Sequence, residues 1–275
     1  MWLLQGKLRE GIFSSRRNDA FALEGMCRAR QYMTTDYIFI SFTVYETSLY
    51  LTVIFDTPKQ TTSVIPHLLP DLYLSSPPPH HNCTITILVS LLHHLVATYP
   101  SQLSFRQCLD EIPSSLMPRS LETLQWINSL SWSLRTRNYI KFEELTRLSA
   151  ISQLFTVSGT DTDTLSTALA SLSIVPDNNN SLPRRAFEVL VDNLRRKTRA
   201  TTWNVIRAAY REFSCATAAE ESGTPDWLAR SLCLRRLLPY EVAIDADMWL
   251  EQQSLLGYVR RKEGTDRRWI VCKVG

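Results

Sequence analysis

The sequence predicts an all-α chain of stacked helical hairpins that ends in a small module with a β-hairpin. Only eight glycines occur in 275 residues, too few for the many tight turns of a β-rich fold. Apolar residues recur every three or four positions along most of the chain, which is typical of amphipathic helices. Hydrophobic residues make up 44% and charged residues 21% of the chain, as in folded globular proteins.

The helices are expected to begin after an N-terminal extension, residues 1–20. One helix is expected from about Phe21 to Met33, and it leads into another with an apolar stripe at Phe39, Phe42, Tyr45, Leu49 and Val53. Pro58 suits the first turn of the next helix, whose apolar face contains Val64, Leu68, Leu69 and Leu72. Residues 75–81 contain three consecutive prolines, which predict an exposed loop.

Two further stripes predict the middle helices. They consist of Ile87, Leu91, Leu92 and Leu95, and of Leu124, Ile127, Leu130 and Leu134. Asn138 is expected to end the second helix, because asparagine tolerates the left-handed conformation, and Tyr139, Phe142, Leu145 and Leu148 mark its returning partner. Polar loops at 158–163 and 177–180 flank a short helix at about 165–172. Residues 21–215 therefore form a domain in which each helical hairpin buries one face on the next.

The C-terminal part begins with a long helix that starts near Pro183 and runs through Phe213. A helix start is expected at Thr224-Pro225, and a further helix with Ala246, Trp249 and Gln253 on one face is closed by Gly257. Short strands at 258–262 and 267–274 flank the turn 263–266. Two helices followed by a basic β-hairpin are typical of a winged helix-turn-helix module, which we assign to residues 216–275.

No set of residues indicates an enzyme. His80 and His81 near Cys83 lack a second pair of ligands at zinc-finger spacing, and His93 and His94 are adjacent, so they point to different sides of a helix. Phosphate-binding loops and nucleophile elbows are missing from the sequence. The six cysteines are isolated and are expected to be reduced, buried thiols. We therefore expect neither catalysis nor a metal or cofactor, and no membrane span.

Charge is more informative, although the formal net charge is only +3. Arginines on a long helix and on a wing can bracket phosphates, whereas a solvated charged surface is the equally weighted alternative. The residues expected to bind a nucleic-acid backbone are Arg195, Arg196, Arg199, Arg260, Arg261, Lys262, Arg267 and Arg268.

The helix in the position of a groove reader is acidic instead. Between Tyr240 and Gly257 it has no lysine or arginine, so phosphates would repel it and readout of base edges is disfavoured. We expect this helix to dock on a protein, through Tyr240, Glu241, Asp245, Asp247 and Glu251.

Five short patches follow one another along the chain: Met26 to Gln31, Val44-Tyr45-Glu46 followed by Leu72-Tyr73, Ile112-Pro113, Asn138-Tyr139 with Phe142, and the arginine-rich helix that ends in Tyr210-Arg211. In this order they resemble the Sac-three/GANP family of PCI-type scaffolds. The resemblance covers most of the chain from Met26. Tyr32-Met33 departs from the acidic-Leu pair common in the family, and the proline loop with the helix after it looks inserted.

The resemblance implies a TPR/PCI-like helical-repeat scaffold in nuclear mRNA export at the nuclear pore. A second PCI-type subunit and a small acidic subunit are the implied partners, with RNA or DNA contacted through winged helices. The nucleus is the implied location, while relatives also act in splicing or at the centrosome, and a cytoplasmic location stays open. Two alternatives remain: a proteasome-lid subunit of the Nin-one type and, less favoured because of the acidic helix, a DNA-binding regulator.

Overall fold

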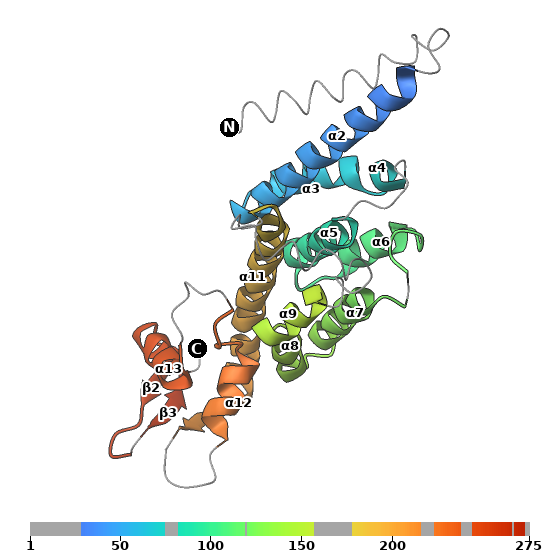
Figure 1. Cartoon of the computed structure of the whole chain (residues 1–275). Coiled ribbons are helices and arrows are strands. Elements are labelled where there is room, and N and C mark those ends of the chain that lie inside the picture. The colour runs from blue at the N-terminus through green and yellow to red at the C-terminus, as the bar shows by residue number, and fades with distance from the viewer. Residues whose placement is uncertain are drawn as a thin grey trace, which may run out of the picture. The chain divides into compact units, whose positions relative to one another are not determined.

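The computed structural model is mostly helical and contains one small antiparallel sheet (Figure 1), as expected for an all-α fold with a β-hairpin. It describes residues 29–74, 82–118, 120–156, 178–215, 223–237, 244–265 and 267–272, with the backbone alone for 29–40, 156 and 178–181. The chain divides into two compact units. Unit 1 comprises Met1–Arg119 and Val175–Leu190, and unit 2 comprises Ser120–Ile174 and Val191–Gly275.

Unit 1 consists of packed helices. α2 packs on α3, α3 on α4 and α5, and α5 on α6. The helices expected on either side of residue 33 form one helix, while residues 21–28 lie outside the described part. The bounds are α2 Ala29–Ile54, α3 Pro58–Leu68, α4 Asp71–Leu74, α5 Cys83–Thr98 and α6 Leu103–Glu111.

The predicted apolar faces of unit 1 are buried. Pro58 occupies the first turn of α3, where a missing backbone N–H costs no hydrogen bond. The expected stripe of α5 is fully enclosed, because its members have almost no exposed surface: Ile87, Leu91, Leu92 and Leu95. The predicted proline loop, residues 75–81, lies outside the described residues.

Unit 2 joins a helical hairpin to the sheet. α7 packs on α8, α8 on α9 and α12, and α12 on α13, which contacts β2. The elements are α7 Glu122–Arg135, α8 Tyr139–Leu145, α9 Leu148–Thr156, α12 Thr224–Ser231, α13 Ala246–Leu255, β1 Glu212–Ser214, β2 Val259–Arg261 and β3 Arg268–Val271.

The turn between α7 and α8 differs from the prediction by one residue. Arg137, and not Asn138, adopts the left-handed conformation, with φ 57. The Asn138 side chain instead accepts a hydrogen bond from the Lys141 backbone N–H, so it caps the start of α8. Asparagine suits both the end and the start of a helix. Here it caps the start of α8, because the first N–H groups of that helix lack partners within the helix.

α11, Asn178–Ala209, is the long helix expected from Pro183. It begins earlier, so Asn178 to Asn180 are helical and not the predicted loop, and Pro183 lies inside the helix. The helix also ends earlier, because Phe213 belongs to β1. The predicted loop 158–163 and helix 165–172 lie outside the described residues.

The sheet contains the predicted hairpin and one strand that was not predicted. β2 and β3 pair antiparallel around a turn in which Gly264 has φ 70, a conformation that favours glycine. β1 pairs with the other edge of β3, which gives the order β1-β3-β2. Since β1 precedes residue 216, the predicted domain boundary at 216 excludes a strand of the C-terminal sheet.

The core of the C-terminal part unites the end of α11 with the sheet and with α12 and α13. Large aromatic side chains from three elements meet there, among them Trp203, Phe213 and Trp269. The other buried members are Ile206, Cys215, Leu228, Leu232, Leu234, Ala246, Leu250, Val259 and Val271. Burying such side chains stabilises each by about 1.5–3 kcal/mol, so these elements form one hydrophobic module.

The five cysteines in the described residues are free, and Cys83, Cys215 and Cys233 are buried. Burial raises the pKa of each of these three thiols to about 11. No helix among the described residues has both the length and the apolar character needed to cross a lipid bilayer.

Candidate functional site

Arg195 lies inside unit 2. Its side chain is only 1% exposed, and the guanidinium donates hydrogen bonds to the backbone carbonyls of Thr146 (2.9 Å), Cys233 (3.3 Å) and Arg235. Thr146 caps the C-terminus of α8, and Cys233 follows the end of α12. The prediction that Arg195 contacts nucleic acid is therefore wrong, because its donors are enclosed and already used.

Arg199, one turn further along α11, acts in the same way. It is half-buried and donates to the carbonyls of Leu232 (2.9 Å) and Cys233 (2.7 Å). Cys233 has φ 50, a conformation that is unfavourable for a residue with a side chain. The guanidinium groups of Arg195 and Arg199 thus bind the backbone carbonyls at the turn that ends α12. The donors of Arg199 are therefore also largely used within unit 2.

Arg207 extends this pattern to the end of the chain. Its guanidinium lies 4.0 Å from the centroid of the Tyr258 ring and donates to the Cys272 carbonyl at 3.2 Å. Stacking of a guanidinium on an aromatic ring is favourable. Three arginines of α11 therefore bind neighbouring elements of unit 2 rather than a ligand.

Arg196 is the predicted α11 site residue that reaches solvent. It is exposed and forms an ion pair with the buried Asp192, one helical turn earlier, at 2.5 Å. An ion pair one helical turn apart leaves part of the guanidinium accessible, so Arg196 stays compatible with a contact to phosphate.

The outer face of the sheet brings three of the predicted residues together. In the register, Arg260 lies opposite Ile270, which lies opposite Glu212, and Arg268 and Lys262 follow two residues along the strands. Lys262 and Arg268 approach the Glu212 carboxylate at 3.3 and 3.6 Å. Arg260, Lys262 and Arg268 share this face with the single carboxylate of Glu212, so the net charge of these four residues is positive. The exposed ion pairs among them are weak.

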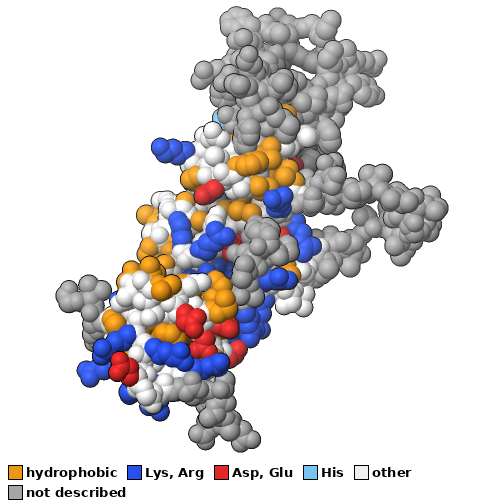
Figure 2. Space-filling view, turned by 90° about the vertical axis from the view of Figure 1, so that its left-hand side faces the viewer, with side chains coloured by type: hydrophobic (Ala, Val, Ile, Leu, Met, Phe, Trp, Pro, Cys, Tyr) orange, Lys and Arg blue, Asp and Glu red, His pale blue; other side chains and the backbone are white. Residues whose placement is uncertain are grey.

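The remaining wing residues are placed differently. Arg261 lies opposite the buried Trp269, on the other face of the sheet, and is exposed at its edge. Arg267 pairs with Asp247 of α13 at 3.4 Å. Figure 2 shows Lys and Arg side chains with acidic and hydrophobic side chains close beside them. The structure therefore gathers Arg260, Lys262 and Arg268 and separates the others.

The predicted partner-binding helix, α13, carries its acidic residues in distinct roles. Asp245 caps the helix, since its side chain accepts from the Met248 N–H at 2.7 Å. Asp247 binds Arg267, and Glu251 is exposed. Tyr240 and Glu241 lie outside the described residues. Of the described acidic residues, Glu251 is the one best placed to meet a partner.

Sequence reasoning missed the apolar part of the same surface. Met248 and Leu255 are 43% and 89% exposed, and Leu256 at the end of the helix is 63% exposed. Met248 and Leu255 are seven residues apart, so they lie on one side of α13. Their seven-residue spacing also fits a buried apolar stripe, so the sequence pattern does not distinguish an exposed patch from a face of the core.

A buried polar network lies in unit 1. The Tyr73 hydroxyl donates to Glu46, and Asn82 Nδ2 donates to the other carboxylate oxygen at 3.2 Å, which joins α2, α4 and the start of α5. Burial, followed by the Glu46 charge, raises the pKa of Tyr73 well above its usual range. The tyrosine therefore stays protonated and serves as a hydrogen-bond donor.

Among the described residues, no group of three His, Cys, Asp or Glu side chains is arranged to hold a metal ion. Comparison with known proteins adds no assignment, because no family model, curated protein or solved structure matches the chain.

Proposed function

We propose that this chain is a non-catalytic scaffold subunit whose C-terminal elements form a winged-helix module. The support is the order of elements: the end of α11, β1, α12, α13, β2 and β3, with β3 central in the sheet. A winged helix combines a helix-turn-helix with such a sheet and its hairpin. The preceding helices would then be the TPR/PCI-like stack of the Sac-three/GANP type.

Contacts between the patches that carry the resemblance support the same proposal. Val44-Tyr45-Glu46 and Leu72-Tyr73, separated in sequence, meet through the Tyr73–Glu46 hydrogen bond. Asn138 caps α8, and Arg195 of the arginine-rich helix binds the end of that same helix at Thr146. The motif residues thus have structural tasks that suit a shared fold.

The observation that carries the function is the surface of α13. It combines exposed apolar side chains, Met248 and Leu255, with the exposed carboxylate of Glu251, whereas phosphates would be repelled there. Exposed apolar side chains beside acidic ones suit a protein interface. We assign this surface to the partner PCI-type subunit of a nuclear mRNA-export complex that also contains a small acidic subunit, and the outer face of the sheet to RNA.

Affinity purification of the tagged chain from its own cells tests the assignment. Mass spectrometry should recover a second helical-repeat subunit with a winged helix and a small acidic protein in near-equal amounts. Recovery of proteasome-lid subunits would instead establish the Nin-one-type alternative. Recovery of neither set would contradict the scaffold function.

A surface variant links the partner to α13. Met248→Ser with Leu255→Ser should reduce recovery of the partner at least tenfold and leave the melting temperature within a few degrees, because both side chains are exposed. Leu148→Ser on α9, also 48% exposed, is the matched control and should leave recovery unchanged. Equal recovery with both variants would exclude α13 as the interface.

A further inference from the structure

The solvent face of α7 in unit 2 presents a single large aromatic side chain. Trp132 is 58% exposed. Its neighbours at one helical turn are all polar and exposed: Asn128, Ser129, Arg135 and Thr136. An isolated aromatic ring on a polar helix face gains little from folding, since most of its surface stays in water.

Positive charge lies beside this ring and follows it in the sequence. The Arg135 guanidinium lies 4.5 Å from the centroid of the Trp132 ring. Arg137 follows at the end of the helix, exposed and in the left-handed conformation with φ 57. Lys141, in the first turn of α8, is 55% exposed, and its ammonium is 3.5 Å from the Glu144 carboxylate. The α7–α8 turn therefore carries three cations close in sequence to one exposed ring.

We propose that Trp132, Arg135 and Arg137 form a binding site for single-stranded nucleic acid. An unpaired base stacks on the Trp132 ring, and the two guanidinium groups contact the flanking phosphates. Proteins that bind single strands combine aromatic platforms with cations in this way, and each stacked base contributes substantially to affinity. Every base has a flat face, so the site accepts many sequences.

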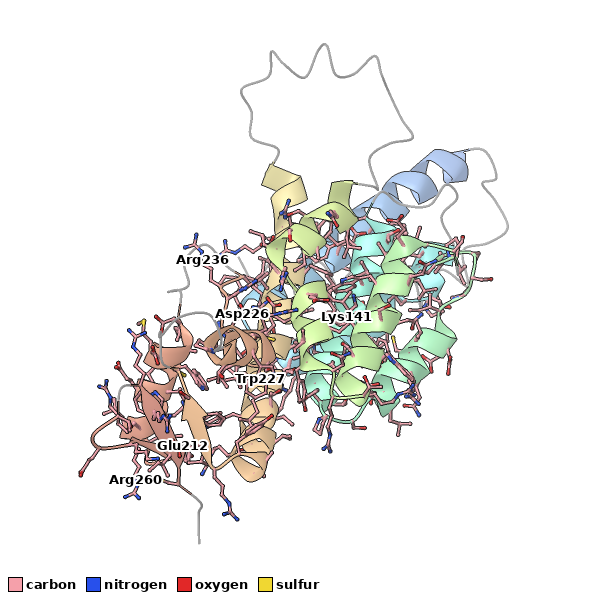
Figure 3. All side chains as sticks on the ribbon, turned by 90° about the horizontal axis from the view of Figure 1, so that it is seen from below. Lys141, Glu212, Asp226, Trp227, Arg236 and Arg260 are labelled. Atoms are coloured by element: carbon pink, nitrogen blue, oxygen red, sulfur yellow. The ribbon has the colours of Figure 1, made fainter. Side chains whose placement is uncertain are left out.

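The surroundings of Trp132 favour nucleic acid over protein. A protein interface of this kind needs several apolar side chains together, as on α13, whereas Trp132 stands alone among polar residues. Cations beside the ring suit phosphates and disfavour a basic partner. Figure 3 places Lys141 on α8 well away from Glu212 and Arg260 at the sheet, so this site is separate from the outer face of the sheet.

The test is binding of the whole chain to short fluorescent oligouridine and oligothymidine at low salt, measured by anisotropy. Trp132→Leu keeps an apolar side chain but removes the ring, and should weaken binding roughly tenfold. Trp132→Phe should retain most of the affinity. Arg135→Gln with Arg137→Gln should weaken binding and flatten its dependence on salt. Equal affinity for the RNA and DNA strands would show that the site does not distinguish ribose from deoxyribose.

Three results would overturn the proposal. The first is that Trp132→Leu binds like the unchanged chain, and the second is that Trp132→Phe loses as much affinity as Trp132→Leu. The third is that a duplex of the same length competes as well as the single strand, which would mean that no unpaired base is needed. The matched control is Leu148→Ser, which should bind normally. Because Trp132→Leu should leave partner recovery unchanged, failure here is distinguishable from failure of the scaffold assignment.

Discussion

Arg195 shows how one residue can hold several ends of chain together. A single planar guanidinium binds carbonyls at the end of α8 and after α12. Carbonyls at a helix end lack partners within the helix, and a guanidinium has five donors in a fixed fork. Arg195 therefore donates to three carbonyl acceptors in the interior of unit 2, and it shares one of them, the Cys233 carbonyl, with Arg199.

Replacing Arg195 with Met should lower the free energy of unfolding by about 3 kcal/mol or more, because each buried carbonyl left without a donor costs about 1–3 kcal/mol. Arg195→Lys should fall in between, since one ammonium cannot reproduce the fork. Urea denaturation followed by circular dichroism measures the effect.

The exposed Arg185 on the same helix provides the control. Arg185→Met should cost less than about 0.5 kcal/mol, as for other surface substitutions. Equal losses for the two variants would mean that Arg195 does not serve as this internal donor.

The burial of Arg195 was detectable in the sequence only in part. Arg195 stands at helical spacing from Val191, Thr198 and Thr202, all buried, so its position on the inner face of α11 followed from periodicity. The arginine-rich composition suggested a surface instead. Composition does not say which side of a helix each charge occupies, and the acceptors come from distant segments that only the fold brings near.

At the scale of elements, the start of α3 and the glycine turns were predictable, whereas the start of α11 and the extra strand were not. Pro58, Gly257 and Gly264 have local conformational preferences that act regardless of the rest of the fold. Val205, Ala209 and Phe213 continue a four-residue spacing, so the pattern predicted helix through β1. Pairing with β3, more than fifty residues later, overrides that local pattern.

The cap of α13 provides a test at this scale. Asp245→Ala should lower the free energy of unfolding by about 1 kcal/mol, because the Met248 N–H loses its acceptor. Glu251→Ala, on the exposed side of the same helix, should have almost no effect on stability. Thermal melting of both variants distinguishes the structural carboxylate of Asp245 from the exposed carboxylate of Glu251. An equal loss of stability for Glu251→Ala and Asp245→Ala would contradict this division.

At the scale of the whole molecule, the end of α11 belongs to the same hydrophobic core as the sheet. Trp203 packs edge-on against Trp249 at 6.3 Å between ring centroids and lies 6.2 Å from Phe213. Trp249, which the sequence places on one face of its helix with Ala246 and Gln253, is only half-buried, whereas Trp203 and Trp269 are buried. The predicted domain boundary at 216 would have cut through this core.

Trp269→Ala should therefore destabilise the C-terminal module by about 3–5 kcal/mol, the usual cost of removing a buried aromatic ring. Trp249→Ala should cost less, since part of its ring already contacts water. Differential scanning calorimetry of the two variants gives the order, and a larger loss for Trp249→Ala would show that the burial is assigned to the wrong tryptophan.

The central position of β3 also constrains the sequence of events during synthesis. β1 and β2 pair only with β3 among the described strands, and β3 follows every other described element. While the ribosome is still adding residues up to Trp269, the apolar sides of Phe213 and Val259 have no strand beside them. The hydrophobic core of this module is therefore incomplete until β3 has been added, and we expect a chaperone to bind the nascent chain in this interval.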